Sequence, residues 1–139
     1  MDYIINYIKN FNVLCAAGFI QSILPLCNSI VITNIRKDEY SIVMQKNIEK
    51  YFREKYFEVD IDMEYYEFEK GKNLIELGDG DKSSLFFALQ TGRIIIENNA
   101  IVVRIAEELG LETISIESFI KQFINDDVLI NMFNEMKFV

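Results

Sequence analysis

Short apolar runs alternate with segments of helical period along this chain. Aliphatic or β-branched runs predict buried strands at Tyr3 to Ile5, Ser29 to Thr33 and Arg93 to Ile96, and a further strand at Glu112 to Ser115. Strands that alternate with helices form parallel sheets that are covered on both faces. The pattern therefore predicts a three-layer α/β/α fold with a central, mostly parallel sheet.

Apolar residues at helical spacing predict one long helix from Ile35 to Phe57. Ser83 or Ser84 is expected to cap a helix that runs to about Leu89 and ends at Gly92. Four further helices are expected. One begins at about Phe19, and one runs from Asn99 to Leu109 before Gly110. One runs from Ile116 to Ile124 after a capping Ser115, and the last spans Asp127 to Phe138. Because no linker or repeat separates these segments, residues 1–139 are expected to form one domain.

The tract from Glu58 to Tyr65 alternates acidic and apolar residues. This is the period of a half-buried strand, with four acids on one face. Two interpretations stay open. The tract is either a solvated edge strand whose charge prevents pairing with other chains, or a docking strip for a basic partner.

The amino-acid composition excludes several catalytic mechanisms. The 139 residues include no histidine, which excludes Ser-His and Cys-His nucleophile pairs and an imidazole base. Cys15 and Cys27 are interpreted as small core residues, as expected in a reducing cytoplasm. A net charge of −8 argues against broad nucleic-acid binding, but it is compatible with a nuclease whose metal supplies positive charge.

The stretch from Asn10 to Ile35 carries no charge, which raises the question of a membrane segment. It contains several polar residues and Pro25, which a spanning helix would hold only at a cost. We interpret the stretch as buried domain core. The expected location is cytoplasmic, with no membrane partner.

Several motifs occur in a specific order. Gly80-Asp81 opens a helix, Ile94 to Ile96 ends in Glu97-Asn98-Asn99, and the next helix closes on Leu109-Gly110. Upstream, Ile30 to Thr33 is followed by Glu39, and the segment Ala16 to Ile20 precedes them. Together these motifs resemble the PIN-domain family of ribonucleases and toxins. The resemblance covers most of the chain outside about residues 42–73.

The resemblance implies three or four carboxylates that converge on Mg²⁺ or Mn²⁺, which activates water and neutralises a phosphate. By position, Glu39 matches the second acid and Asp81 the third, with Asp79 beside it. The implied catalytic set is Glu39, Asp79, Asp81 and Glu97. The implied metal ligands are Glu39, Asp81, Asn6 and Asn98.

Asparagine stands at two of the family's acid positions. The first acid falls on Asn6, or on Asn10 in a second alignment, and the fourth falls on Asn98, one residue after Glu97. Each exchange of aspartate for asparagine removes a negative charge from a site that works by charge. Mg²⁺ or Mn²⁺ is therefore expected to bind weakly.

Three functions remain open from the sequence. The first is a PIN-like domain of ribonuclease or toxin lineage, as in toxin–antitoxin systems, that has weakened or lost catalysis and acts mainly through a protein partner. The second is an active Mg²⁺-dependent endoribonuclease with RNA as its substrate. The third is an α/β assembly module without nuclease ancestry.

An oligomer or a complex is expected because the chain is rich in apolar residues. Half of the residues are hydrophobic, including 11 Phe and 7 Tyr. The C-terminal segment carries an apolar stripe that either joins a second chain or packs onto its own sheet. The stripe consists of Val128, Leu129, Met132, Phe133 and Met136.

Overall fold

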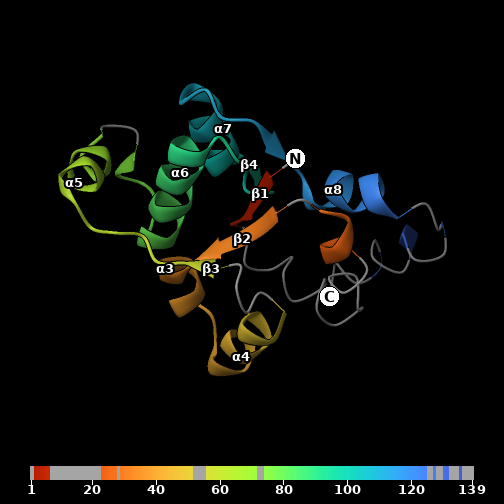
Figure 1. Cartoon of the computed structure of the whole chain (residues 1–139). Coiled ribbons are helices and arrows are strands. Elements are labelled where there is room, and N and C mark those ends of the chain that lie inside the picture. The colour runs from red at the N-terminus through yellow and green to blue at the C-terminus, as the bar shows by residue number, and fades with distance from the viewer. Residues whose placement is uncertain are drawn as a thin grey trace.

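A computed structural model describes a parallel sheet between helices (Figure 1). The described residues are 2–6, 23–27, 29–51, 56–71, 74–124, 127, 130, 131 and 135. The sheet has the strand order β3-β2-β1-β4-β5. The strands are β1 (Asp2–Ile5), β2 (Ser29–Thr33), β3 (Tyr56–Phe57), β4 (Ile94–Ile96) and β5 (Thr113–Ile114).

Strand β1 lies at the centre of the sheet. Tyr3 pairs in parallel register with Ile30 of β2 and with Ile94 of β4. The outer pairings, of β2 with β3 and of β4 with β5, are also parallel. This confirms the predicted α/β fold with a mostly parallel sheet.

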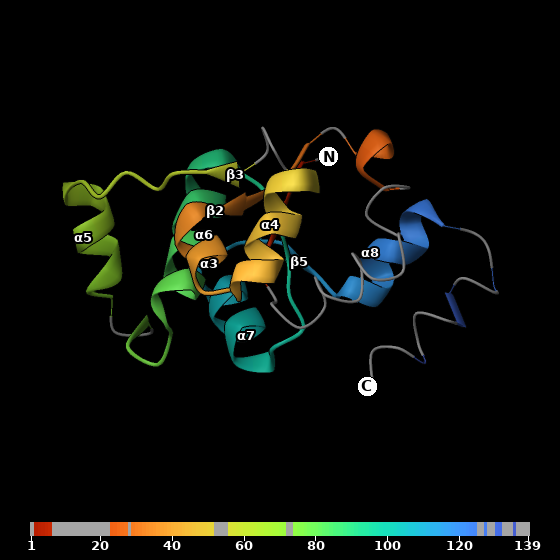
Figure 2. The same ribbon diagram turned by 90° about the horizontal axis from the view of Figure 1, so that it is seen from below.

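Alternate side chains of β1 divide the core into two layers, as the pleat requires. Ile4 packs in the cluster that includes helices α6 (Asp79–Thr91) and α7 (Ala100–Glu108). Tyr3 and Ile5 pack in the cluster on the other face, which includes α4 (Ile42–Tyr51) and α8 (Ile116–Phe123). Figures 1 and 2 show the two helix layers on opposite sides of the sheet.

Several predicted helix ends are confirmed. Ser115 caps α8 by accepting a hydrogen bond from the Ser118 amide, and Asn99 caps α7. Helix α6 ends at Gly92, whose φ of 69° suits a residue without Cβ. Helix α6 begins earlier than predicted, however, with Gly78 at its N-cap. Ser83 and Ser84 are buried inside it.

The predicted long helix from Ile35 to Phe57 is wrong. The segment forms α3 (Asn34–Asp38), a turn at Glu39, helix α4 and then strand β3. Thr33 caps α3 by accepting from the amide of Arg36. Glu39 is the C-cap of α3, and its carboxylate accepts the backbone amide of Gly80. Tertiary contacts thus override a continuous helical pattern.

The predicted strand from Glu58 to Tyr65 is also wrong. Residues 58–62 have no regular structure, and Asp62 caps helix α5 (Met63–Glu69) through a hydrogen bond from the Tyr65 amide. The ring of Tyr65 packs edge-on against Phe86 of α6, with centroids 5.1 Å apart. An alternating pattern this short does not distinguish a strand from a loop that enters a helix.

Some predictions fall outside the described residues. These are the start of the helix from about Phe19, the segment Ala16 to Ile20, Asn10, Cys15 and the C-terminal stripe residues. A short 3-10 helix, η1 (Leu24–Leu26), precedes Cys27, a half-buried free thiol. Within the described ranges, no helix is long and apolar enough to cross a membrane.

Candidate functional site

Polar side chains from four segments meet at the carboxyl edge of the sheet. Asn6 directly follows β1, Glu97 directly follows β4, and Arg36 lies in α3 just after β2. Asp81 lies in the first turn of α6. Strands β1 and β4 are neighbours at the point where the strand order reverses. In open parallel sheets this point is the usual place for a ligand.

The guanidinium of Arg36 is the centre of this cluster. Its Nε donates to Asn6 Oδ1 at 3.0 Å, and its Nη1 donates to Glu39 Oε2 at 2.9 Å. Its Nη2 donates to Asp81 Oδ1. Arg36 is only 5% exposed. A buried arginine requires such paired, hydrogen-bonded anions because its desolvation is costly.

Asn6 links two carboxylates. Its Nδ2 donates to Asp81 Oδ1 at 2.9 Å and to Glu97 Oε2 at 2.5 Å. Its Oδ1 faces the Arg36 donor, so the partners fix the orientation of the amide: carboxylates accept only, and guanidinium donates only. An aspartate at this position would have no N–H to offer Asp81 or Glu97. The asparagine therefore fits the charges that surround it.

Gly80 brings α6 close to α3. Its amide donates to Glu39 Oε1 at 2.6 Å. A Cβ at position 80 would lie 2.5 and 2.7 Å from the carboxylate oxygens of Glu39 and 2.8 Å from Cζ of Arg36. A side chain at position 80 would therefore displace the end of the Glu39 or Arg36 side chain.

Two hydroxyls fasten the same turn to the end of β2. Thr33 Oγ1 and Ser83 Oγ lie 2.7 Å apart, and Ser83 donates to the carbonyl oxygen of Gly80. Since the Ser83 proton is used there, the Thr33 hydroxyl donates to Ser83 and accepts from the Arg36 amide. Both hydroxyls are buried and satisfied.

Glu97 turns into the cluster and is 2% exposed. Its Oε1 accepts the backbone amides of Asn98 at 3.0 Å and Asn99 at 2.9 Å. Burial raises the pKa of this carboxyl, the amide of Asn99 and the side chain of Asn6 oppose that shift, and the charge of Asp81 adds to it. Since β4 ends at Ile96, strand alternation does not hold Glu97 away from the cleft.

The structure brings together four of the predicted site residues and separates two. Asn6, Glu39, Asp81 and Glu97 join the cluster. Asn98 turns towards α8, where it accepts the Ile116 amide at 2.9 Å and donates to Glu117 at 3.0 Å. Asp79 is exposed, and its charge acts on Tyr65 of α5, whose pKa is raised chiefly by burial.

Arg36 is the site residue that sequence reasoning missed. A usable signal was present, because Arg36 precedes Glu39 by three residues. This spacing places two side chains side by side on a helix. The contact with Asp81 spans 45 residues and had no local signal.

Comparison with known proteins supports the fold. The chain is similar to the solved structure of a PilT N-terminus domain protein from the hyperthermophilic archaeon Sulfolobus solfataricus P2, with a TM-score of 0.59 and 15% sequence identity. The likeness covers 91% of this chain and 96% of the other. The chain has a PIN-like fold. No protein-family model and no curated protein sequence matches it.

The cluster of this PIN-like domain does not fit a divalent cation as its side chains are placed. Mg²⁺ prefers anionic oxygens in an octahedral arrangement. Here oxygens of Asn6, Glu39 and Asp81 each accept from the Arg36 guanidinium, and the Asn6 amide nitrogen donates to Asp81 and to Glu97. No group of three His, Cys, Asp or Glu suited to a metal occurs in the part of the chain that the structure describes.

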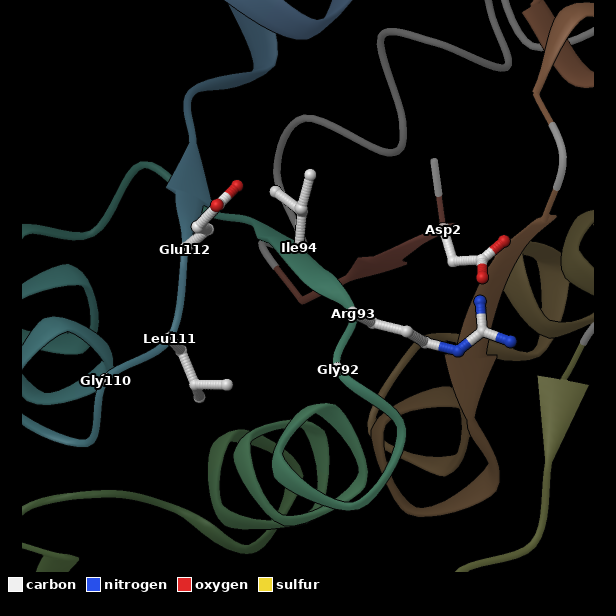
Figure 3. A pocket seen from close by; sticks show the side chains of 7 residues that line it. All are labelled: Asp2, Gly92, Arg93, Ile94, Gly110, Leu111 and Glu112. Atoms are coloured by element: carbon white, nitrogen blue, oxygen red, sulfur yellow. The ribbon is translucent and has the colours of Figure 1, made fainter.

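A hollow of about 360 Å³ lies at the opposite edge of the PIN-like domain, near the amino ends of β1, β4 and β5. Figure 3 shows Asp2 and Arg93 facing each other on one side of it, with Leu111 and Glu112 across. The Arg93 guanidinium donates to the carbonyl of Tyr3 and to the Ser29 hydroxyl. Arg93 therefore ties strands together, and the hollow offers no cluster of chemical groups comparable to that at the carboxyl edge.

Proposed function

We propose that this PIN-like domain is of ribonuclease or toxin lineage, has lost metal-dependent catalysis and acts mainly through a protein partner. The observation that carries the proposal is the Arg36 guanidinium bonded to Asn6, Glu39 and Asp81. A nuclease of this fold needs those oxygens free for a cation that polarises the phosphate and activates water. Arginine neutralises carboxylates but does not generate a metal-bound hydroxide.

Asn6 supports the same proposal independently. As a neutral amide it adds no negative charge to the edge, and by donating to Asp81 and Glu97 it occupies two lone pairs that a cation would need. The carboxyl groups of the cluster are thus hydrogen-bonded by donors of the chain itself. Mg²⁺ or Mn²⁺ is expected to bind only at millimolar concentration, a dissociation free energy of about 4 kcal/mol.

An RNA-cleavage assay tests the loss of catalysis. The purified protein is incubated with a labelled single-stranded RNA in Mg²⁺ and in Mn²⁺, and cleavage at the level of buffer alone is expected. Asp81→Asn is the informative variant, and Asp79→Asn is its matched control, because Asp79 lies in the same helical turn but is exposed. Metal-dependent cleavage that disappears in Asp81→Asn and persists in Asp79→Asn would establish the alternative, an active endoribonuclease.

Helix α5 and the segment before it supply the proposed partner surface. Three apolar side chains there face solvent: Ile61 at 60%, Met63 at 72% and Tyr66 at 47% exposure. Met63 and Tyr66 are three residues apart and share one helix face. Helix α5 projects from the side of the domain in both views (Figures 1 and 2).

The acids beside this apolar surface indicate a basic partner. Five of them are exposed: Glu58, Asp60, Asp62, Glu64 and Glu67. The partner that complements this surface is an amphipathic segment with lysine or arginine around apolar side chains. The tract from Glu58 to Tyr65 is not a strand, but we still propose it as a docking surface for a basic partner.

A synthetic helical peptide of leucine and lysine serves as the probe for this surface. Fluorescence anisotropy is expected to show binding that weakens at least tenfold in Met63→Ser with Tyr66→Ser, and that weakens in Glu64→Gln with Glu67→Gln. Ile42→Ser with Val43→Ser, exposed apolar residues of α4, is the control. Equal binding by all variants would reject the surface. A protein that neither cleaves RNA nor binds the probe here is better described as an α/β assembly module.

A further inference from the structure

We infer that Arg36 is a resident counter-ion that replaces a divalent cation, so that the acidic edge of this domain is stable without metal and becomes cation-dependent when Arg36 is removed. The inference concerns the stability of the fold and goes beyond the loss of catalysis. It uses the same cluster as the proposed function. The experiment below measures thermal unfolding and not RNA cleavage, so this inference and the proposed function can fail separately.

The carboxyl edge of the sheet carries a concentration of acidic groups. Glu39, Asp81 and Glu97 bring three carboxyl groups to one place, and the Arg36 side chain is the cation that contacts two of them. Asn6 joins the third through its amide nitrogen. Without the guanidinium, the carboxylates would repel each other in a partly buried setting, where charge repulsion is poorly screened.

The Arg36 guanidinium is closely packed. A Cβ added at Gly80 would lie within 3 Å of the Glu39 carboxylate oxygens and of Arg36 Cζ, so these side chains pack closely over the glycine. The Thr33 hydroxyl also holds the amide of Arg36 at 3.1 Å. The helix that bears the arginine is therefore fixed at both backbone and side chain. The Arg36 guanidinium therefore has a defined position and is not a chance surface contact.

The test compares Tm in wild type and in Arg36→Met, each with about 10 mM Mg²⁺ or Mn²⁺ or with NaCl of equal ionic strength. Methionine keeps much of the apolar stem but removes the charge. We expect Arg36→Met to lower Tm by about 10 °C, because it leaves the partly exposed carboxylates of Glu39 and Asp81 without their guanidinium. We expect Mn²⁺ to return about 4 °C to this variant, as for a ligand at about ten times its dissociation constant. Wild type should respond equally to the divalent salts and to NaCl.

Two controls separate this role from ordinary packing. Lys37→Met removes a neighbouring buried cation that pairs with Glu49 of α4 at 2.9 Å. Its loss should lower Tm without creating a response to Mn²⁺. Arg36→Lys keeps one charge but loses the fork that reaches three partners, so it should fall between wild type and Arg36→Met.

If Arg36→Met does not fold, the double variant Arg36→Met with Asp81→Asn keeps the inference testable. Removing the charge of Asp81 removes much of the need for a cation, so the double variant should fold and melt higher than Arg36→Met. A double variant no better than the single one would overturn the inference. It would also be overturned if Arg36→Met melted like wild type, or if wild type gained as much from Mn²⁺ as Arg36→Met.

Discussion

The backbone amide of Gly80 lies 2.6 Å from Oε1 of Glu39, although 41 residues separate the two along the chain. This hydrogen bond joins the first turn of α6 to the turn that follows α3. It holds Glu39 where its other oxygen meets Arg36. A carboxylate at the N-terminal turn of a helix is also favoured by the helix dipole.

A methyl group at position 80 should disrupt this contact. In Gly80→Ala the new Cβ would lie within 3 Å of Glu39 and Arg36 atoms, so one of these side chains must move. We expect a loss of about 1–3 kcal/mol in the free energy of unfolding, measured by chemical denaturation. Gly78→Ser is the matched control, because a Cβ there meets no atom within 4 Å and serine is a good N-cap. Equal losses in both variants would contradict the proposed close approach.

Adjacent serines in α6 should respond differently to the same substitution. Ser83→Ala removes the acceptor of the buried Thr33 hydroxyl and the donor to the Gly80 carbonyl. The expected loss is about 1–3 kcal/mol. Ser84→Ala should be neutral or slightly stabilising, because the buried Ser84 hydroxyl has no hydrogen-bond partner among the described residues. Urea denaturation of both variants measures the difference, and similar losses would show that the hydroxyl pair contributes little.

Replacing Asn6 and Asn98 by aspartate should not restore a single metal site. Asn6→Asp removes the N–H groups that Asp81 and Glu97 accept, and adds a charge between them. We expect a loss of about 2 kcal/mol near neutral pH. Asn98→Asp instead sets a carboxylate against Glu117 and should cost about 1 kcal/mol. Isothermal calorimetry should show no gain in Mg²⁺ affinity for Asn98→Asp. A clear gain would mean that Asn98 lines the cluster after all.

Glu97 should give the stability of the fold a specific pH dependence. Burial, the largest effect, raises the pKa of its carboxyl above the ordinary value of 4.5, so the folded protein binds this proton more tightly than the unfolded chain does. The ionised form therefore costs stability at neutral pH. This cost is relieved as the pH falls through the raised pKa towards the ordinary one.

Comparison with Glu97→Gln isolates this contribution. The free energy of unfolding of wild type, taken relative to that of Glu97→Gln, should increase as the pH is lowered from neutral into the acidic range. Denaturant titrations over this range measure the difference. A relative stability that falls on acidification would mean that the hydrogen bonds from Asn6 and from the Asn98 and Asn99 amides outweigh burial.

The sequence alone determined four of the five strands, the end of α6 and both ends of α7 and α8. Strand β2 has the bounds that its β-branched run predicts, and Gly92, Asn99 and Ser115 act at the helix ends where their chemistry places them. These features depend on residues that are close in the chain. Local propensity and hydrophobic period therefore suffice to predict them.

Tertiary structure decided the break after α3, the helix α5 and the charge balance of the candidate site. At the end of α3 the Glu39 carboxylate bonds the distant Gly80 amide, and in α5 the ring of Tyr65 packs against Phe86. The spacing of Arg36 and Glu39 was a local signal for one contact of the guanidinium, but its other two contacts had no such signal. Its partners Asn6 and Asp81 stand 30 and 45 residues away, and only folding brings their oxygens to one guanidinium. Interactions of such separation leave no local period or propensity in a single sequence.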